Sequence, residues 1–246
     1  MANPRFYCPE PIFAEQELVL PPSVAHHVHV RRLAQGETVV LFDGRGGEIA
    51  GTLSFEGKKT SVLLGQHRPK EAELGGEITL IQALPSGDKM DWIIEKAVEL
   101  GVHRVIPVAA QRSVLKLSGA RLEKRLEHWT GIVTAASEQC GRNRLMQLGA
   151  PQTLEQALAD TPPGQRLLCD PEAGDTLAEH LKARQQPHQK IRALSLLIGP
   201  EGGWSPEEIA AASRQGATRI KFGSRVLRTE TAGLALVAAA TALLSW

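Results

Sequence analysis

From Glu77 onward, apolar runs alternate with amphipathic stretches, and this alternation constrains the fold more than any other feature of the chain. Helices are predicted over 88–101 and 117–140, and further helices are expected toward the C-terminus. Strands separated by helices are typical of an α/β domain built around a mostly parallel sheet. The predicted strands, which are rich in branched apolar residues, cover 77–84, 102–108, 166–170, 193–199 and 217–223.

The first 72 residues follow a different pattern. Apolar segments there alternate with the turn signals DG, GG and EG, as in ETVVLFDGRGGEIAGTLSFEG (37–57). Short strands joined by tight turns indicate a small β-rich domain, and 24–34 predicts one short helix. The polar segment 68–76 is the expected linker, so the sequence predicts one domain over 1–72 and a second over 73–246.

Composition narrows the class of protein. The three cysteines, Cys8, Cys140 and Cys169, are far apart, so they predict neither a zinc site nor a disulfide framework, and they fit a reducing cytoplasm. The N-terminus has no apolar core of a secretory signal, and none is expected. The longest apolar segment, 231–246, has 16 residues, whereas about 20 are needed to span a bilayer. The sequence therefore predicts a soluble cytoplasmic protein.

A histidine group near the N-terminus resembles a metal site only superficially. His26 and His29 are three residues apart and could share a helix face with His27 beside them. No carboxylate or cysteine lies nearby in the sequence to complete a ligand set. No metal is expected.

The stretch LLIGPEGGWSPEE (196–208) ends a predicted strand in a glycine-rich loop and enters a helix at once. Ser205 is the predicted N-cap and Glu208 the N3 residue of a capping box. Ligands of open α/β sheets bind at the carboxyl ends of strands, and glycine lets a ligand approach the backbone. The loop has neither a P-loop nor a dinucleotide motif, and Glu201 would repel phosphate. It therefore predicts a site for a ligand without phosphates, with an ordinary tight turn as the alternative.

A second loop, FGSRVLRTETAG (222–233), joins the last predicted strand to the C-terminal helix. Arg225 and Arg228 stand just before that helix, where they add to the positive end of its dipole and favour an anion. The alternative is that they pair with Glu201 or Glu230 for structural reasons.

IGPEGGWSPEE and GSRVLRTETA together resemble the paired motifs of the SPOUT methyltransferases. Within that superfamily, the chain resembles the ribosomal RNA small subunit methyltransferase E family, which makes N3-methyluridine in 16S ribosomal RNA. The resemblance covers essentially the whole chain, because further motifs match in order and spacing. These are PRFYCPEP (4–11), HHVHVRR (26–32), LFDGRGGE (41–48), GDKMDWIIEKAVELGV (87–102) and EQCGR (138–142).

The resemblance implies an RNA-binding PUA-like β-barrel over 1–72 and an α/β SPOUT domain with a deep trefoil knot over 73–246. It also implies a homodimer, and S-adenosylmethionine bound in a bent form among three loops. The knot follows from the resemblance alone. The cofactor-binding residues implied are Leu168, Asp170, Ile198, Gly199, Pro200, Gly203, Phe222, Gly223, Val226, Leu227 and Thr229.

Methylation at uracil N3 requires loss of the N3 proton and stabilisation of negative charge on the ring. Arg142 and Arg228 are the candidates for the second role, because a guanidinium can donate two hydrogen bonds to a carbonyl or a phosphate. Glu138 and Glu201 are candidate bases. Solvent, or an N3 pKa lowered beside an arginine, is the alternative.

Residues 101–146 carry eight Lys or Arg against three Glu, enough for several phosphate contacts despite a net charge of +1 for the whole chain. A solvated amphipathic helix face is the alternative for part of this charge. The RNA-binding candidates are Arg5, Arg31, Arg32, Arg112, Lys116 and Arg142. The expected partner is 16S ribosomal RNA, within the small subunit. A noncatalytic assembly factor and a SPOUT enzyme acting on another RNA are the alternative functions.

Overall fold

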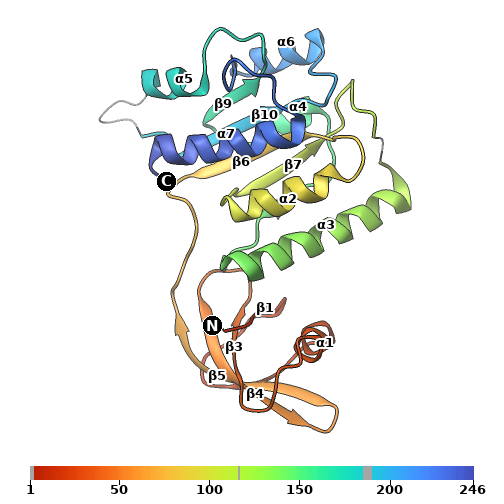
Figure 1. Cartoon of the computed structure of the whole chain (residues 1–246), viewed down its shortest axis with the longest axis vertical. Coiled ribbons are helices and arrows are strands. Elements are labelled where there is room, and N and C mark those ends of the chain that lie inside the picture. Colours follow the sequence, from red (N-terminus) through yellow and green to blue (C-terminus); the bar gives the residue numbers. More distant parts are fainter. Residues whose placement is uncertain (1–2, 116, 185–189) are drawn as a thin grey trace. The chain divides into compact units, whose positions relative to one another are not determined.

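The computed structural model describes residues 3–115, 117–184 and 190–246 (Figure 1). Contacts divide the chain into two units. The first consists of Met1–Glu73 and Thr134–Leu145, and the second of Leu74–Val133 and Met146–Trp246. Helix α3 (Gly119–Cys140) therefore contributes residues to both units.

The first unit contains a five-stranded sheet and helix α1 (Pro22–Val30) in addition to its part of α3, which confirms the β-rich prediction. The sheet order is β1-β3-β4-β5-β2, and only the β1–β3 pair is parallel. The core contains Phe6, Val28, Leu41 and Ile49, all buried. The strands are β1 (Arg5–Tyr7), β2 (Glu17–Val19), β3 (Thr38–Phe42), β4 (Glu48–Glu56) and β5 (Lys59–Arg68).

The second unit contains a six-stranded sheet in the order β11-β9-β10-β6-β7-β8, and every pairing in it is parallel. The α/β prediction is confirmed, and the five predicted strands are all present. The sequence reading missed β8, which has only two residues. The strands are β6 (Glu77–Ala83), β7 (Arg104–Val108), β8 (Gln147–Leu148), β9 (Gln165–Cys169), β10 (Ala193–Ile198) and β11 (Ala217–Ile220).

Helices cover both faces of this sheet (Figure 1). Because side chains alternate along a strand, Ile81 and Ala83 of β6 pack with α4 and α6, while Leu80 and Gln82 face α7. Helices α2 and α5 contact α7. No helix among the described residues is long and apolar enough to cross a membrane. The helices are α2 (Lys89–Glu99), α4 (Leu154–Ala159), α5 (Leu177–Arg184), α6 (Pro206–Arg214) and α7 (Thr229–Leu244).

Gly233 lets α7 lie close to the sheet. A Cβ at this position would come within 3.2 Å of Leu80 Cδ1 and 3.3 Å of Ile198 Cγ1, closer than most side-chain contacts. The N-terminal half of α7 is consequently held close to β6 and to the end of β10, where the glycine-rich loop begins.

Candidate functional site

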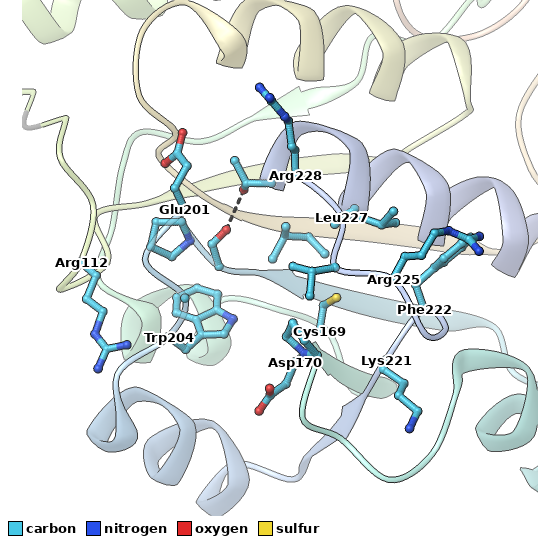
Figure 2. A pocket seen from close by; sticks show the side chains of 18 of the residues that line it. Arg112, Cys169, Asp170, Glu201, Trp204, Lys221, Phe222, Arg225, Leu227 and Arg228 are labelled. Atoms are coloured by element: carbon cyan, nitrogen blue, oxygen red, sulfur yellow. Dashed lines mark hydrogen bonds between the residues drawn. The ribbon is translucent and has the colours of Figure 1, made fainter.

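A cavity of about 510 Å³ lies at the carboxyl ends of β9, β10 and β11 (Figure 2). Its walls come mainly from the three loops that follow these strands: Cys169–Pro171, Ile198–Trp204 and Lys221–Thr229. Lys89, Arg112, Ile209 and Ala232 complete the lining. This volume is within the range of small-molecule sites, and the position is where open α/β sheets bind ligands.

The structure brings together ten of the eleven residues predicted to bind a cofactor. Leu168 is the exception, because its side chain is buried in the core below the cavity and is not among the described lining residues. Glu201, Arg228 and Arg112, predicted for other roles, also line the cavity. The ten are Asp170, Ile198, Gly199, Pro200, Gly203, Phe222, Gly223, Val226, Leu227 and Thr229.

Thr229 joins two of the cavity walls. Its hydroxyl donates a hydrogen bond to the carbonyl of Gly199 at 2.6 Å and accepts one from Gln82 Nε2 at 3.0 Å. Thr229 and Gln82 are both buried, so these bonds form away from solvent. The first residue of α7, the glycine-rich loop and β6 are therefore fixed to one another through one hydroxyl group.

The glycine-rich loop is also held at its far end. The predicted capping box is confirmed: Ser205 Oγ accepts from Glu208 N, and Glu208 Oε2 accepts from Ser205 N at 2.8 Å. Gly203 has a φ of +69°, in the left-handed region that favours glycine, and its N–H closes a turn on Pro200 O at 2.9 Å. Arg112 Nη1 donates to Gly202 O at 3.0 Å. The loop is thus fixed by its own backbone, by the capping box and by Arg112.

Glu201 extends from this loop toward α2. Its Oε1 accepts from Lys89 Nζ at 2.9 Å and from Ser86 Oγ at 2.7 Å. Burial alone would raise the pKa of Glu201, but these hydrogen bonds outweigh it and lower the pKa to about 2. Lys89 also lies 3.4 Å from Glu230 Oε2. A carboxylate held this firmly in its ionised form is a weak proton acceptor at neutral pH.

Arg225 and Arg228 make no ion pair with any described residue. The structural alternative considered for them, pairing with Glu201 or Glu230, is not found, because both carboxylates face Lys89 instead. Arg228 is the N-cap residue of α7 and, like Arg225, is exposed at the cavity. In Figure 2, Arg228 and Glu201 extend to one side of the cavity, and Asp170 and Lys221 extend to the other.

Asp170 has its own partner. Arg219 Nη2 lies 2.6 Å from Asp170 Oδ2, and the other carboxylate oxygen accepts from Glu172 N at 2.9 Å. These contacts hold the short loop after β9 in place. No group of three or more His, Cys, Asp or Glu side chains in the described part of the chain has an arrangement that could hold a metal ion.

Cys169 should react slowly with alkylating reagents. Burial raises the pKa of its thiol from 9.0 to about 11, and the neighbouring Asp170 adds to the rise. Since the thiolate is the nucleophile, a shift of this size makes the reactive form about a hundredfold scarcer at pH 8. We expect iodoacetamide to modify Cys169 at least a hundredfold more slowly in the folded protein than in urea, as followed by peptide mass spectrometry. Equal rates in the two conditions would contradict the described burial.

Several predicted residues lie in the first unit rather than at the cavity. Arg142 was expected to contact uracil or RNA, but it is 2% exposed and its guanidinium donates twice to Glu73, from Nε at 3.0 Å and from Nη2 at 2.6 Å. Arg5 was expected to contact phosphate, but it is bonded to Glu48 and Asn143 inside the unit. Direct contact of either arginine with RNA would require these bonds to open.

The remaining candidates have varied surroundings. Arg31 and Arg32 are exposed, and the Arg31 guanidinium lies 5.4 Å from the centroid of the Phe6 ring. Glu138 accepts from Tyr7 N at 2.9 Å, and burial raises the pKa of its carboxyl group. Lys116 lies outside the described residues.

Comparison with known proteins identifies the family. A family model described as an RNA methyltransferase domain matches residues 71–241, and one described as an RNA methyltransferase PUA domain matches residues 20–64. A relative from Synechocystis named ribosomal RNA small subunit methyltransferase E is 34% identical over 99% of this chain and 78% of its own. The chain belongs to the ribosomal RNA small subunit methyltransferase E family.

Two solved structures resemble this family member along nearly its whole length. A methyltransferase E from Neisseria gonorrhoeae, bound to S-adenosylmethionine, has a TM-score of 0.88 at 34% identity and covers 98% of both chains. A methyltransferase from Legionella pneumophila, also in complex with S-adenosylmethionine, has a TM-score of 0.89 at 32% identity, again over 98% of both chains. The fold of this chain is therefore that of a SPOUT-type RNA methyltransferase with a PUA domain.

Some lining residues of this methyltransferase E family member were missed by sequence reasoning. Lys89 follows the carboxyl end of β6, so the strand-end rule that indicated the other loops also applied to it. Trp204 directly follows the glycine pair, and Lys221 directly follows β11. Nothing in the sequence marks Ile209, which reaches the cavity from α6.

Proposed function

We propose that this protein transfers a methyl group from S-adenosylmethionine to N3 of a specific uridine in 16S ribosomal RNA of the small subunit. The observation that carries the proposal is the cavity formed by the three loops at the carboxyl ends of β9, β10 and β11, two of which line it with glycine. The two closely similar solved proteins that hold S-adenosylmethionine support the choice of cofactor.

The cavity fits this cofactor chemically. Its wall includes the apolar side chains of Ile198, Leu227 and Ala232, which suit an adenosyl group without phosphates. The indole Nε1 of Trp204 is buried and has no hydrogen-bond partner among the described atoms. A Cβ at Gly199 would lie 3.3 Å from this nitrogen, so the bare backbone leaves room beside a buried donor. The nitrogen and oxygen acceptors of S-adenosylmethionine match such a donor.

Bound S-adenosylmethionine supplies an electrophilic methyl group. The loop backbones of Gly199, Gly203 and Gly223 would hold its adenosyl part, and Arg225 would suit the carboxylate of its methionine part. Arg228 is the residue we assign to stabilising negative charge on the uracil, because its guanidinium is exposed at the cavity and unpaired among the described residues.

We assign the role of accepting the N3 proton to solvent beside Arg228. Glu201 was a catalytic candidate, as the base, but its pKa of about 2 makes it a poor proton acceptor. We assign Glu201 to a structural role, in which its hydrogen bonds with Ser86 and Lys89 hold the loop in place. Glu138, the other candidate base, belongs to the first unit, where it accepts from Tyr7 N, and it is not among the described lining residues of the cavity.

The proposal extends to the assembly and location of the protein. We include a deep trefoil knot in the 73–246 domain, a homodimer and a cytoplasmic location. The apolar α7 and the exposed Trp92 on the neighbouring α2, 46% exposed, support a surface for a second copy.

The function is tested by incubating small ribosomal subunits that lack the modification with labelled S-adenosylmethionine and analysing the nucleosides by mass spectrometry. We expect N3-methyluridine with the wild-type protein and a loss of at least a hundredfold in rate with Arg228→Ala, because removing a charge-stabilising donor costs this much in other enzymes. Label in another nucleoside would support methyltransferase activity but contradict N3 of uridine as its target. Poor binding of the cofactor in calorimetry, together with no transfer to subunits or naked RNA, would favour the noncatalytic assembly factor.

A further inference from the structure

Four exposed cations lie around one turn of the first unit. The turn follows β3 and runs through Asp43–Gly47. Arg45 forms an isolated antiparallel bridge with Arg144, so these two residues are directly opposite each other. Arg68 is the register partner of Glu48, at the start of β4, and Lys70 lies 3.4 Å from Glu48 Oε1. Arg45, Arg68, Lys70 and Arg144 together form a surface that we call the cationic edge.

We propose that the cationic edge binds phosphates of the RNA substrate. The inference rests on the proposed function, since it names the surface by which the first unit holds that RNA.

The backbone of the turn is built to place Arg45 at an exposed tip. Gly44, Gly46 and Gly47 have φ values of +80°, +108° and +71°, a conformation that other residues rarely adopt. The N–H of Arg45 is fixed by Asp43 Oδ1 at 3.1 Å. With glycine on both sides, Arg45 carries the only side chain at the tip, and that side chain is exposed.

Arg144 is held against the same turn. A Cβ at Gly46 would overlap both the Arg144 guanidinium and the Glu71 carboxylate, so the backbone passes directly over this pair. Glu71 Oε1 lies 3.3 Å from Arg144 Nη2 and accepts from Gly47 N at 3.0 Å. Arg144 nevertheless keeps 52% of its side chain exposed. Its position is fixed while its guanidinium still reaches solvent.

The local charge is positive because two nearby acids are already neutralised by arginines inside the unit. Glu48 is paired with Arg5, and Glu73 with Arg142. Among the described side chains that contact the turn, Asp43 and Glu71 remain to oppose the four cations of the cationic edge, so these six residues carry a net charge of +2. Net positive charge on an exposed turn favours phosphate.

An aromatic ring lies at the same place. Tyr7 Cε2 would be 3.3 Å from a Cβ at Gly44, and the Tyr7 ring packs against Phe42 with centroids 5.7 Å apart. Surfaces that bind single-stranded RNA combine cations with aromatic rings. In the other arginine pair of this unit, Arg31 and Arg32, the Arg31 guanidinium already contacts the ring of Phe6.

The test measures the affinity of the full-length protein for a labelled 16S ribosomal RNA transcript at several salt concentrations. For single-stranded RNA, each lost phosphate contact lowers the slope of log affinity against log salt by about 0.7, which corresponds to about fivefold weaker binding at 0.1 M salt. We expect RNA binding to weaken by about fivefold in Arg45→Ala and by about 25-fold when Arg45→Ala is combined with Arg144→Ala. In both variants the KM for RNA should rise and kcat should stay unchanged.

The matched control is the double variant Lys58→Ala and Lys59→Ala. It removes two exposed charges from the same unit, at the turn between β4 and β5. Equal losses in the control and in the edge variants would overturn the proposal, as would an effect confined to Arg31→Ala and Arg32→Ala. Calorimetry with S-adenosylhomocysteine, which is S-adenosylmethionine without the transferred methyl group, separates the two proposals. A wild type that does not bind it refutes the proposed function, whereas binding together with an unchanged salt slope in Arg45→Ala refutes only the role of the cationic edge.

Discussion

Arg142→Ala is expected to lower the free energy of unfolding by about 3–5 kcal/mol, the usual cost of removing one partner from a buried ion pair. The Arg142 side chain is 3% exposed and holds both oxygens of Glu73, which is itself 22% exposed. Removing the guanidinium leaves this carboxylate in a poorly solvated place without the two hydrogen bonds that it accepts from Arg142. Urea or thermal unfolding of the two proteins, followed by circular dichroism, measures the difference.

A double substitution separates this structural role from a direct role in RNA methylation. Arg142→Met combined with Glu73→Met replaces both charges with apolar side chains of similar length, and we expect it to recover most of the lost stability. A recovered protein that still methylates RNA would assign Arg142 to the fold, whereas a stable but inactive one would assign it to the reaction. An Arg142→Ala protein as stable as the wild type would contradict the buried pair.

Thr229→Val is expected to weaken the binding of S-adenosylmethionine by about tenfold or more. Valine has nearly the same shape but no hydroxyl, so it leaves the Gly199 carbonyl and one N–H of Gln82 without their partner. An unsatisfied buried polar group costs about 1–3 kcal/mol, and about 1.4 kcal/mol corresponds to tenfold in affinity. Because Gly199 forms a wall of the cavity, part of this cost should appear in ligand binding. Calorimetry measures it.

Two further variants isolate the hydroxyl group. Thr229→Ser keeps the donor and the acceptor and should bind S-adenosylmethionine within about threefold of the wild type, because less than 1 kcal/mol is at stake in one methyl group. Thr231→Val makes the same chemical change at an exposed position two residues later and should leave binding unchanged. If Thr229→Val bound as well as either variant, the link between α7 and the loop would have no role in holding the cofactor.

Local features of the fold could be predicted from the sequence. The capping box of Ser205 and Glu208 depends on residues three positions apart, and the five predicted strands of the second unit depend on runs of four to seven residues. The order of the strands has no such local basis. Packing between distant segments decides that β11 pairs with β9 rather than with β10, and the periodicity of the sequence does not indicate this pairing.

At the candidate site too, features formed by neighbouring residues could be predicted and contacts between distant residues could not. The glycine-rich loop could be recognised because its residues are contiguous in the sequence. The Lys89–Glu201 contact could not, because it joins residues 112 positions apart. Arg142 was visible as a basic residue in a motif, whereas Glu73, its partner 69 positions earlier, gave no signal. A sequence shows which charges exist. Whether a charge faces solvent or another buried charge depends on the tertiary fold.

The division of α3 between the two units has a consequence for biosynthesis. The first unit includes Thr134–Leu145, so it cannot complete its contacts when Glu73 leaves the ribosome. It must wait for 72 more residues, about 4–14 s at ordinary rates of translation. During that interval, the nascent Glu73 and the N–H of Tyr7 lack Arg142 and Glu138, which are still to be made. The small N-terminal unit, although first in the chain, finishes folding only after much of the second has been synthesised.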